Sequence, residues 1–254
     1  MTGNDIDRST EVARGGKTVF GAAVGILMLD TRFPRIPGDM GNAASWPFPV
    51  LYRVVRGAAP EHVVRRAADG LLPAFVAAAR DLVADGADGI TTNCGFLSLF
   101  QTALAEAVDV PVASSSLMQV PLVQSLLPPS KVPGIVTICA ETLSEAHLSA
   151  CGVPADTPII GTDDGDEFSR VILGDERALD VAKAGAEILA ASKQLLERSP
   201  EVGALVLECT NMVPYAAYLR EQLGIPVFSI YSFVQWFQAG LLPRAFSTRL
   251  ADPR

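Results

Sequence analysis

The chain has few of the groups that build disulfide frameworks, metal sites or nucleic-acid interfaces. Its 254 residues include only 4 cysteines and 2 histidines, with no C-x-x-C pair and no Cys/His cluster. A disulfide scaffold or a structural zinc site is therefore not expected. Lys and Arg number 20 against 28 Asp and Glu, which gives a formal net charge of −8. Affinity for nucleic acid comes mainly from neutralised phosphates, so this balance argues against a nucleic-acid partner.

Nucleotide-binding motifs and long apolar runs are also missing. Neither G-x-G-x-x-G nor a Walker loop occurs, so we predict a reaction without a nucleotide cofactor or a metal. The residues are 49% hydrophobic, yet no stretch approaches the roughly 20 apolar residues that span a bilayer. The first 17 residues contain charged side chains and no apolar signal core. We expect no membrane partner, a flexible tail at 1–17, and a soluble cytoplasmic protein.

Short β-branched runs alternate along the chain with longer Ala- and Leu-rich stretches. This alternation is typical of α/β proteins whose parallel sheets are covered by helices. Gly86 is placed to end one helix, and Ser199-Pro200 is placed to stop another. The predicted strands are 19–29, 88–92, 110–113, 134–139, 158–161, 203–208 and 225–230, and the predicted helices are 60–84, 96–107, 117–126, 141–150, 175–198, 212–223 and 232–242.

One segment, 30–49, is an unusually long loop. It holds four prolines and two glycines, and no regular element is predicted within it. Loops of this length in a compact domain are usually lids or binding loops, with a plain surface excursion as the alternative. We expect Asn42 to contact a ligand from this loop.

The sequence contains an internal repeat. Residues 88–117 align without gaps with 203–232, and a weaker match links 24–29 to 133–138. The fold class that we predict is α/β with two pseudo-symmetric lobes, each a parallel sheet flanked by helices, and an active site between them. Lobe 1 is placed at 18–118 plus 231–254 and lobe 2 at 119–230; chance similarity of two βαβ units is the alternative. The aligned identities are Cys94/Cys209, Leu104/Leu219, Glu106/Glu221, Pro111/Pro226, Val112/Val227 and Ser114/Ser229.

Each repeated cysteine stands where a predicted strand ends and a helix begins. Ligands of open parallel sheets bind at the carboxyl ends of the strands. A helix N-terminus favours a thiolate, and the N–H groups after it can receive a carboxylate. If the lobes face each other, Cys94 and Cys209 approach one substrate from opposite sides. One thiolate can remove a proton while the other thiol returns one, which inverts a carbon acidified by a neighbouring carbonyl.

The motifs resemble those of the aspartate/glutamate/hydantoin racemase superfamily. Thr92-Asn93-Cys94-Gly95 is similar to the first cysteine motif, and Glu208-Cys209-Thr210-Asn211 is similar to the second. Val136-Thr137, followed by Glu141-Thr142, resembles the threonine-bearing start of the second lobe. The resemblance implies a cofactor-independent enzyme with two lobes and one catalytic cysteine in each.

Two departures from the family pattern argue against glutamate as the substrate. Asn93 precedes the first cysteine, whereas amino-acid racemases usually have Cys-Asn-Thr. Asn211 stands where glutamate racemases have a histidine, so a neutral amide replaces a titratable group.

The resemblance therefore leads us to expect a racemase or epimerase, an isomerase of an amino acid or a derivative such as a hydantoin. The expected partner is a small carboxylate or hydantoin substrate. Dimerisation is common in the family, which leaves a homodimer or a higher homo-oligomer open. Cys94 and Cys209 are the expected catalytic residues. The expected substrate-binding residues are Asn42, Thr92, Asn93, Gly95, Thr137, Thr142, Thr210 and Asn211.

Other activities stay open at this point. Two-lobe relatives include cis–trans isomerases and decarboxylases of small dicarboxylic acids, although a decarboxylase needs only one thiol. A non-catalytic protein that closes on a small acid would explain the duplication but not a cysteine in each motif. Of the other two cysteines, Cys151 is predicted to be structural, and Cys139 is predicted to lie in the core, with a place in the site as its alternative.

Overall fold

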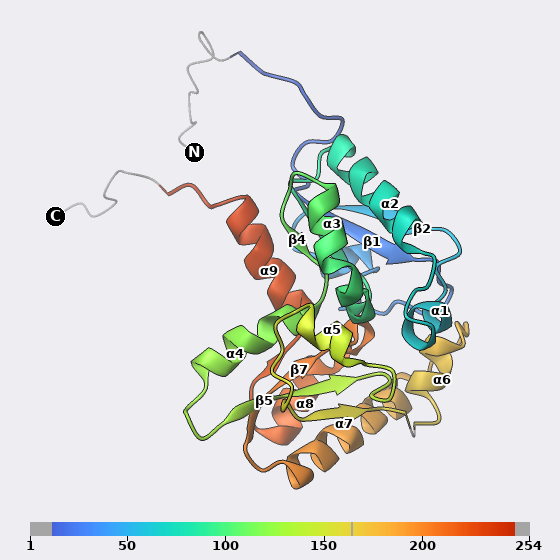
Figure 1. Cartoon of the computed structure of the whole chain (residues 1–254), viewed down its shortest axis with the longest axis vertical. Coiled ribbons are helices and arrows are strands. Elements are labelled where there is room, and N and C mark those ends of the chain that lie inside the picture. The colour runs from blue at the N-terminus through green and yellow to red at the C-terminus, as the bar shows by residue number, and fades with distance from the viewer. Residues whose placement is uncertain (1–11, 164, 247–254) are drawn as a thin grey trace, which may run out of the picture.

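The computed structural model describes residues 12–163 and 165–246. Within them the chain forms two four-stranded sheets whose strand pairs are all parallel, with helices packed against them (Figure 1). The strand orders are β2-β1-β3-β4 and β6-β5-β7-β8, so the two sheets have the same topology. The predicted α/β fold class with two similar sheets is confirmed.

The first sheet is built around β1 (Val24–Leu29), whose six residues are all buried. Its other strands are β2 (Val50–Val55), β3 (Gly89–Thr92) and β4 (Val112–Ala113). The accompanying helices are α1 (Pro60–Arg65), α2 (Leu72–Asp85), the 3-10 helix η2 (Gly95–Phe100) and α3 (Gln101–Ala107). Helix α2 contacts β1, β2 and β3, and α9 (Ile230–Leu241) also contacts β3.

The second sheet contains β5 (Val132–Thr137), β6 (Ile159–Gly161), β7 (Val202–Leu207) and β8 (Val227–Phe228). Helix α7 (Val181–Arg198) packs on β5 and β6, and α8 (Ala216–Leu223) packs on β8. The remaining elements around this sheet are η3 (Ser116–Gln119), α4 (Val120–Leu126), α5 (Glu145–Ser149), α6 (Phe168–Leu173) and η4 (Thr210–Tyr215).

The repeat in the sequence corresponds to equivalent elements in the two sheets. The elements η2, α3 and β4 of the first sheet begin 115 residues before η4, α8 and β8 of the second. Leu27 is paired with Thr92 between β1 and β3, and Val136 is paired with Leu207 between β5 and β7. The two cysteines that follow β3 and β7 therefore occupy matching places.

The structure departs from the predicted elements where local conformation was not readable from composition. The helix predicted over 60–84 is two helices, because Ala67 and Ala68 adopt positive φ values of 50° and 53°. Strand β2 was not predicted; its residues are mostly half-buried at the edge of the sheet and lack a clear apolar alternation. Helix α6 was also missed, and α7 begins only at Val181, where the Asp180 side chain accepts from two backbone N–H groups.

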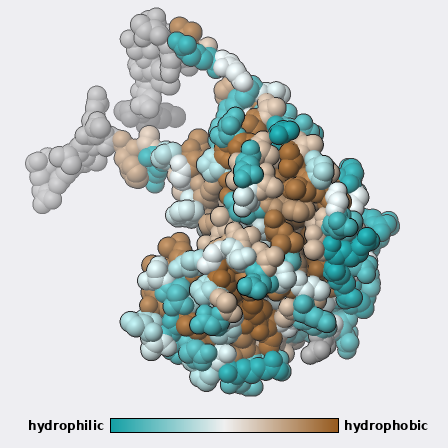
Figure 2. All heavy atoms as spheres, viewed as in Figure 1, coloured by the Kyte–Doolittle hydropathy of each residue, from teal (hydrophilic) through white to brown (hydrophobic). Residues whose placement is uncertain are grey.

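The segment 30–49 connects β1 to β2 and contains one short 3-10 helix, η1 (Ala43–Ser45). Hydrophilic residues gather on the side of the molecule where α1 and α6 lie (Figure 2). No helix among the described residues is both long and apolar enough to cross a membrane. Of the predicted tail, residues 1–11 fall outside the described residues, and the division into lobes stays a prediction.

Candidate active site

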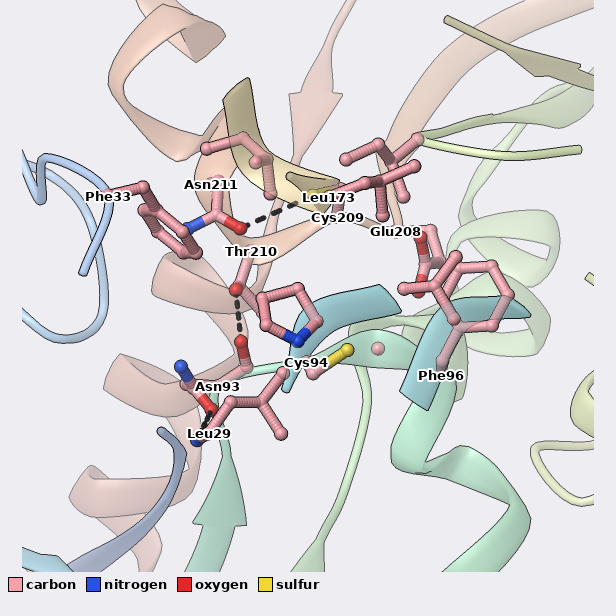
Figure 3. A pocket seen from close by; sticks show the side chains of 15 residues that line it. Leu29, Phe33, Asn93, Cys94, Phe96, Leu173, Glu208, Cys209, Thr210 and Asn211 are labelled. Carbon is pink, nitrogen blue, oxygen red and sulfur yellow. Dashed lines mark hydrogen bonds between the residues drawn. The ribbon is translucent and has the colours of Figure 1, made fainter. Parts of the chain in front are cut away.

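The two repeated cysteines line one small cavity. Cys94 follows β3 and precedes η2, and Cys209 follows β7 and precedes η4, so each sheet contributes one thiol (Figure 3). Eight lining residues are apolar and close the space with aliphatic and aromatic side chains, a composition typical of small-molecule sites. These eight are Leu29, Phe33, Pro60, Val64, Phe96, Ile138, Ile172 and Leu173.

The structure brings six of the ten predicted site residues to this cavity. They are Asn93, Cys94, Gly95, Cys209, Thr210 and Asn211. The Asn93 side chain accepts from the N–H of Leu29 at 2.8 Å, and the Thr210 hydroxyl donates to the carbonyl oxygen of Asn93 at 2.5 Å. Since Thr210 belongs to the second sheet's helix η4, this second bond joins the two halves of the site.

The other four predicted residues lie outside the lining. Thr92 is buried, and its hydroxyl donates to the carbonyl of Ser114 at 2.6 Å. The Asn42 amide is engaged inside its own loop: it donates to the carbonyl of Arg35 and accepts from the N–H of Ala44. Thr142 lines a separate pocket beside Cys139. Cys139 and Cys151 are both buried.

Thr137, the last of the four, holds Glu208, a residue that is not among the predicted site residues. Its buried hydroxyl donates to Oε2 of Glu208 at 2.7 Å. Glu208 lines the cavity beside Cys209 and is fully buried, and its second oxygen, Oε1, has no hydrogen-bond partner among the described residues. Burial raises the pKa of this carboxyl to about 7, against a smaller lowering by the Thr137 hydroxyl.

Glu208 could have been noticed in the sequence from an asymmetry in the repeat. It occupies the position directly before Cys209, where the first copy has Asn93 before Cys94. The two motifs otherwise match, but the residue before the cysteine is an amide in the first motif and a carboxylic acid in the second.

The surroundings of the thiols make both of them weak acids in the free protein. Burial and the nearby Glu208 raise the pKa of Cys94 to about 12, opposed by the N–H groups of Phe96 and Leu97. For Cys209, burial and the same carboxyl raise the pKa well above the usual value, and only one backbone N–H, that of Asn211, acts against them. Cys94 therefore has more direct support for a thiolate than Cys209.

The 30–49 loop reaches the site through Arg35, Asp39 and Phe33 rather than through Asn42. Arg35 forms an ion pair with buried Asp39 at 2.7 Å, and the other Asp39 oxygen accepts from the Asn211 side-chain amide at 2.6 Å. This fixes the amide with its oxygen toward Cys209, whose thiol donates to it at 3.7 Å. Within the parts of the chain that the structure covers, no group of three or more His, Cys, Asp and Glu could hold a metal ion.

Comparison by sequence finds relatives that are named as lyases. "Dimethylsulfoniopropionate lyase 5" of Emiliania huxleyi (strain CCMP1516) is 32% identical over 229 residues, which cover 84% of this chain and 44% of that protein. "Dimethylsulfoniopropionate lyase" of Durusdinium sp. clade D is 28% identical over 229 residues, which cover 87% of this chain and 75% of that protein. The chain thus spans less than half of the first relative's length. No family model matches the sequence.

These relatives correct the expected activity. The racemase or epimerase that the two-cysteine motifs suggested, and with it the isomerase class, is wrong, because the relatives are lyases by name. Among the alternatives, the decarboxylase fits better, since a decarboxylase is also a lyase. That a decarboxylase needs only one thiol does not exclude it, because the second thiol need not transfer a proton.

Comparison by structure bears on the fold. Unliganded arylmalonate decarboxylase has a TM-score of 0.52 at 16% identity, with 90% of this chain and 96% of that chain covered. Picrophilus torridus aspartate racemase has a TM-score of 0.56 at 12% identity, with 89% and 96% covered. Both share the arrangement of two parallel sheets described above. The chain therefore has the fold of the aspartate/glutamate racemase superfamily.

Proposed function

We propose that this chain is a lyase that eliminates a β-substituent from a small carboxylate, with dimethylsulfoniopropionate as its substrate. The observation that carries the proposal is the pair of thiols, Cys94 and Cys209, at one apolar cavity. The identity of the proposed substrate comes from the names of the sequence relatives. A thiol that can remove a proton next to a carboxylate is the group that such an elimination needs.

The reaction balances without water, an oxidant or a reductant. A thiolate takes a proton from the carbon next to the carboxylate. The electron pair left behind forms a double bond to the neighbouring carbon, and the bond from that carbon to sulfur breaks. The sulfur keeps the bonding pair and leaves as neutral dimethyl sulfide, acrylate remains, and the proton stays on the cysteine.

Within this proposal Cys94 is the base. Two backbone N–H groups, from Phe96 and Leu97, act on its sulfur, and they stabilise a negative charge there. Cys209 instead donates its S–H to the oxygen of the Asn211 amide, which keeps it in the thiol form. The two pseudo-symmetric cysteines then have different roles, which is what a one-way elimination requires and a racemisation does not.

The substrate carboxylate needs a receptor other than a cationic side chain, since no Lys or Arg is among the lining residues. Backbone N–H groups at the start of η2 and η4, those of Gly95 and Thr210, are the groups proposed for it. Hydrogen bonds to this carboxylate strengthen as the negative charge spreads onto it during proton removal.

The apolar lining has a second use in the proposed reaction. Leu29, Phe33 and Leu173 exclude water from the carbon that loses its proton, so that the developing charge meets fixed N–H groups rather than solvent. Separately, we propose that the protein is cytoplasmic and forms a homodimer or a higher homo-oligomer.

The test is release of dimethyl sulfide and acrylate from dimethylsulfoniopropionate by the purified chain. We expect Cys94→Ser to lower kcat by at least about a hundredfold, because the hydroxyl is a far weaker acid than a thiol. Cys209→Ser should lower kcat less, since Cys209 stays a thiol in this proposal and does not remove the proton. Cys139→Ser, a change to a buried cysteine outside the cavity, is the matched control. Full activity in Cys94→Ser, or no cleavage by the wild type, would overturn the proposal.

A further inference from the structure

Apart from the two thiols, the cavity is lined by one ionisable side chain, and it is acidic. Among the fifteen lining residues, Glu208 is the only Asp, Glu, Lys or Arg. In the close view its carboxyl group lies near the side chains of Cys94 and Phe96 (Figure 3). A site with one carboxylate, apolar walls and no cationic side chain suits a ligand group that is positively charged.

The Glu208 carboxyl is only half satisfied. It is fully buried, Oε2 accepts from Thr137, and Oε1 has no partner. Leaving a buried acceptor unpaired destabilises the folded protein, and the effect is larger for a charged group. A fold keeps such a group only with a compensating use, and a ligand in the cavity can supply the missing partner.

Oε1 of Glu208 also depends on the absence of a side chain at a neighbouring residue. Oε1 lies against Gly95, where a methyl group on the glycine would overlap both Oε1 and the Glu208 carbonyl oxygen. Gly95, which follows β3 of the first sheet, therefore has no side chain at the point where the carboxyl of Glu208, which follows β7 of the second sheet, is placed. Gly95 stands directly after Cys94, so the acidic group sits beside the proposed base.

We infer that Glu208 is the specificity residue that receives the positively charged onium group of the substrate. This inference rests on the proposed function for the identity of that group, a dimethylsulfonio group on a propionate. The carboxylate supplies a counter-ion, and the ring of Phe96 beside it supplies an aromatic group, which attracts onium cations. The site would then select zwitterions over simple carboxylates of the same shape.

The neighbouring ionisable groups are compatible with this role. Cys94, Cys209 and Cys151 all interact with Glu208, and in each case the carboxyl raises the thiol pKa. Arg35 lies close enough to affect Cys94, but its guanidinium is already paired with Asp39. His147, on α5, contacts the Phe96 ring by its edge, and burial lowers its pKa to about 4, so it is neutral at pH 7.

A competing role for Glu208 is that of a neutral acid that donates to the substrate carboxylate. The two roles differ in whether ligand binding releases a proton from Glu208. At pH 6 a carboxyl with a pKa near 7 is mostly protonated, so binding of a cation releases a proton, whereas a neutral donor keeps its proton. They also differ in kinetics: the sulfonium loses its charge as the bond breaks, so a counter-ion stabilises the bound substrate more than the transition state and acts mainly on KM.

Two unreactive ligands of nearly the same shape provide the test. 3-(Trimethylammonio)propionate carries a cationic nitrogen where 4,4-dimethylpentanoate carries a carbon, and neither has a sulfonium to lose. We expect the wild type to bind the cationic ligand at least about tenfold more tightly, with release of a proton at pH 6 measured calorimetrically in buffers of different ionisation enthalpy. Glu208→Gln, which keeps an acceptor for Thr137, should abolish both the preference and the proton release.

The control is Glu141→Gln, which removes one negative charge from an exposed position outside the cavity and should leave the preference unchanged. Thermal unfolding of Glu208→Gln establishes that it is folded, and a raised KM for dimethylsulfoniopropionate with kcat retained gives a second readout. Equal affinity of the wild type for the two ligands, or an undiminished preference in Glu208→Gln, would overturn the inference. Because no turnover is needed, failure of the lyase assay with a preserved preference would refute only the proposed function.

Discussion

Burial sets the ionisation of the groups around the cavity. Glu208 has no cationic partner, so loss of hydration raises its pKa to about 7, and its carboxyl in turn raises the pKa of Cys94 and Cys209. In the free protein at neutral pH both cysteines are therefore thiols. A bound cation beside Glu208 would oppose this effect, because it adds positive charge next to Cys94. The charge of the substrate and the pKa of Cys94 are then linked through the Glu208 carboxyl.

The same shift predicts how stability depends on pH. An unfolded glutamate ionises near pH 4.5, whereas buried Glu208 stays protonated until about pH 7. The free energy of unfolding therefore falls as pH rises between these values, by about 3 kcal/mol for a shift of this size. Glu208→Gln lacks this loss, so it should be more stable than the wild type at pH 8 by up to that amount and about equal to it at pH 4.

Denaturant unfolding of both proteins at the two pH values provides the measurement. His147 acts in the opposite direction, since its lowered pKa costs stability as pH falls from 6.5 toward 4, but it is common to both proteins and cancels in their difference. A variant that is less stable than the wild type at pH 8 would show that the buried carboxyl is not raised in pKa.

At the scale of elements, the site depends on equivalent helices placed at the ends of two strands. The elements η2 and η4 each begin directly after a cysteine, and cross-bonds such as that from Thr210 to the Asn93 carbonyl hold them together. The hydroxyl of Ser116, in η3, donates to the carbonyl of Leu207 at 2.7 Å and holds η3 against the end of β7, next to Cys209. The thiol positions are therefore set by backbone geometry.

Two glycine substitutions separate packing at the site from ordinary helix propensity. Gly95→Ala places a methyl group against Oε1 and the carbonyl oxygen of Glu208, so we expect a loss of about 1–3 kcal/mol in the free energy of unfolding together with reduced lyase activity. Gly240→Ala in α9 meets nothing within 4 Å and should stabilise the protein by up to about 1 kcal/mol with activity unchanged. Thermal unfolding and the dimethyl sulfide assay measure both. A stable, fully active Gly95→Ala protein would contradict the close approach of Glu208.

At the scale of the whole molecule, duplication explains both what the sequence predicted and what it did not. The ungapped repeat around Cys94 and Cys209 predicted two equivalent sheets with one of these cysteines after a strand of each, and in the structure both cysteines line one cavity. Edge strand β2 and the break between α1 and α2 were missed, because half-burial and positive φ values leave little trace in composition.

The chemistry was mispredicted for a related reason. Two facing thiols suit any reaction that begins by removing a proton, and the fate of the resulting carbanion depends on what the substrate can expel. The pseudo-symmetric motifs suggested equal roles for the two cysteines. The asymmetry has two sources. Glu208 stands in the second motif where the first has Asn93, and the Asp39–Asn211 hydrogen bond joins residues that lie far apart in the sequence.

The central claim is that Cys94 removes a proton from the carbon next to the substrate carboxylate while a neutral sulfide leaves. Dimethylsulfoniopropionate carrying two deuterium atoms on that carbon tests it most directly. We predict that the wild type releases dimethyl sulfide and acrylate that keeps one deuterium, more slowly than from the unlabelled substrate. Cys94→Ser should form both products at least about a hundredfold more slowly than the wild type. Cleavage by Cys94→Ser at the wild-type rate, or exchange of deuterium with solvent in the wild type without any dimethyl sulfide, would contradict it.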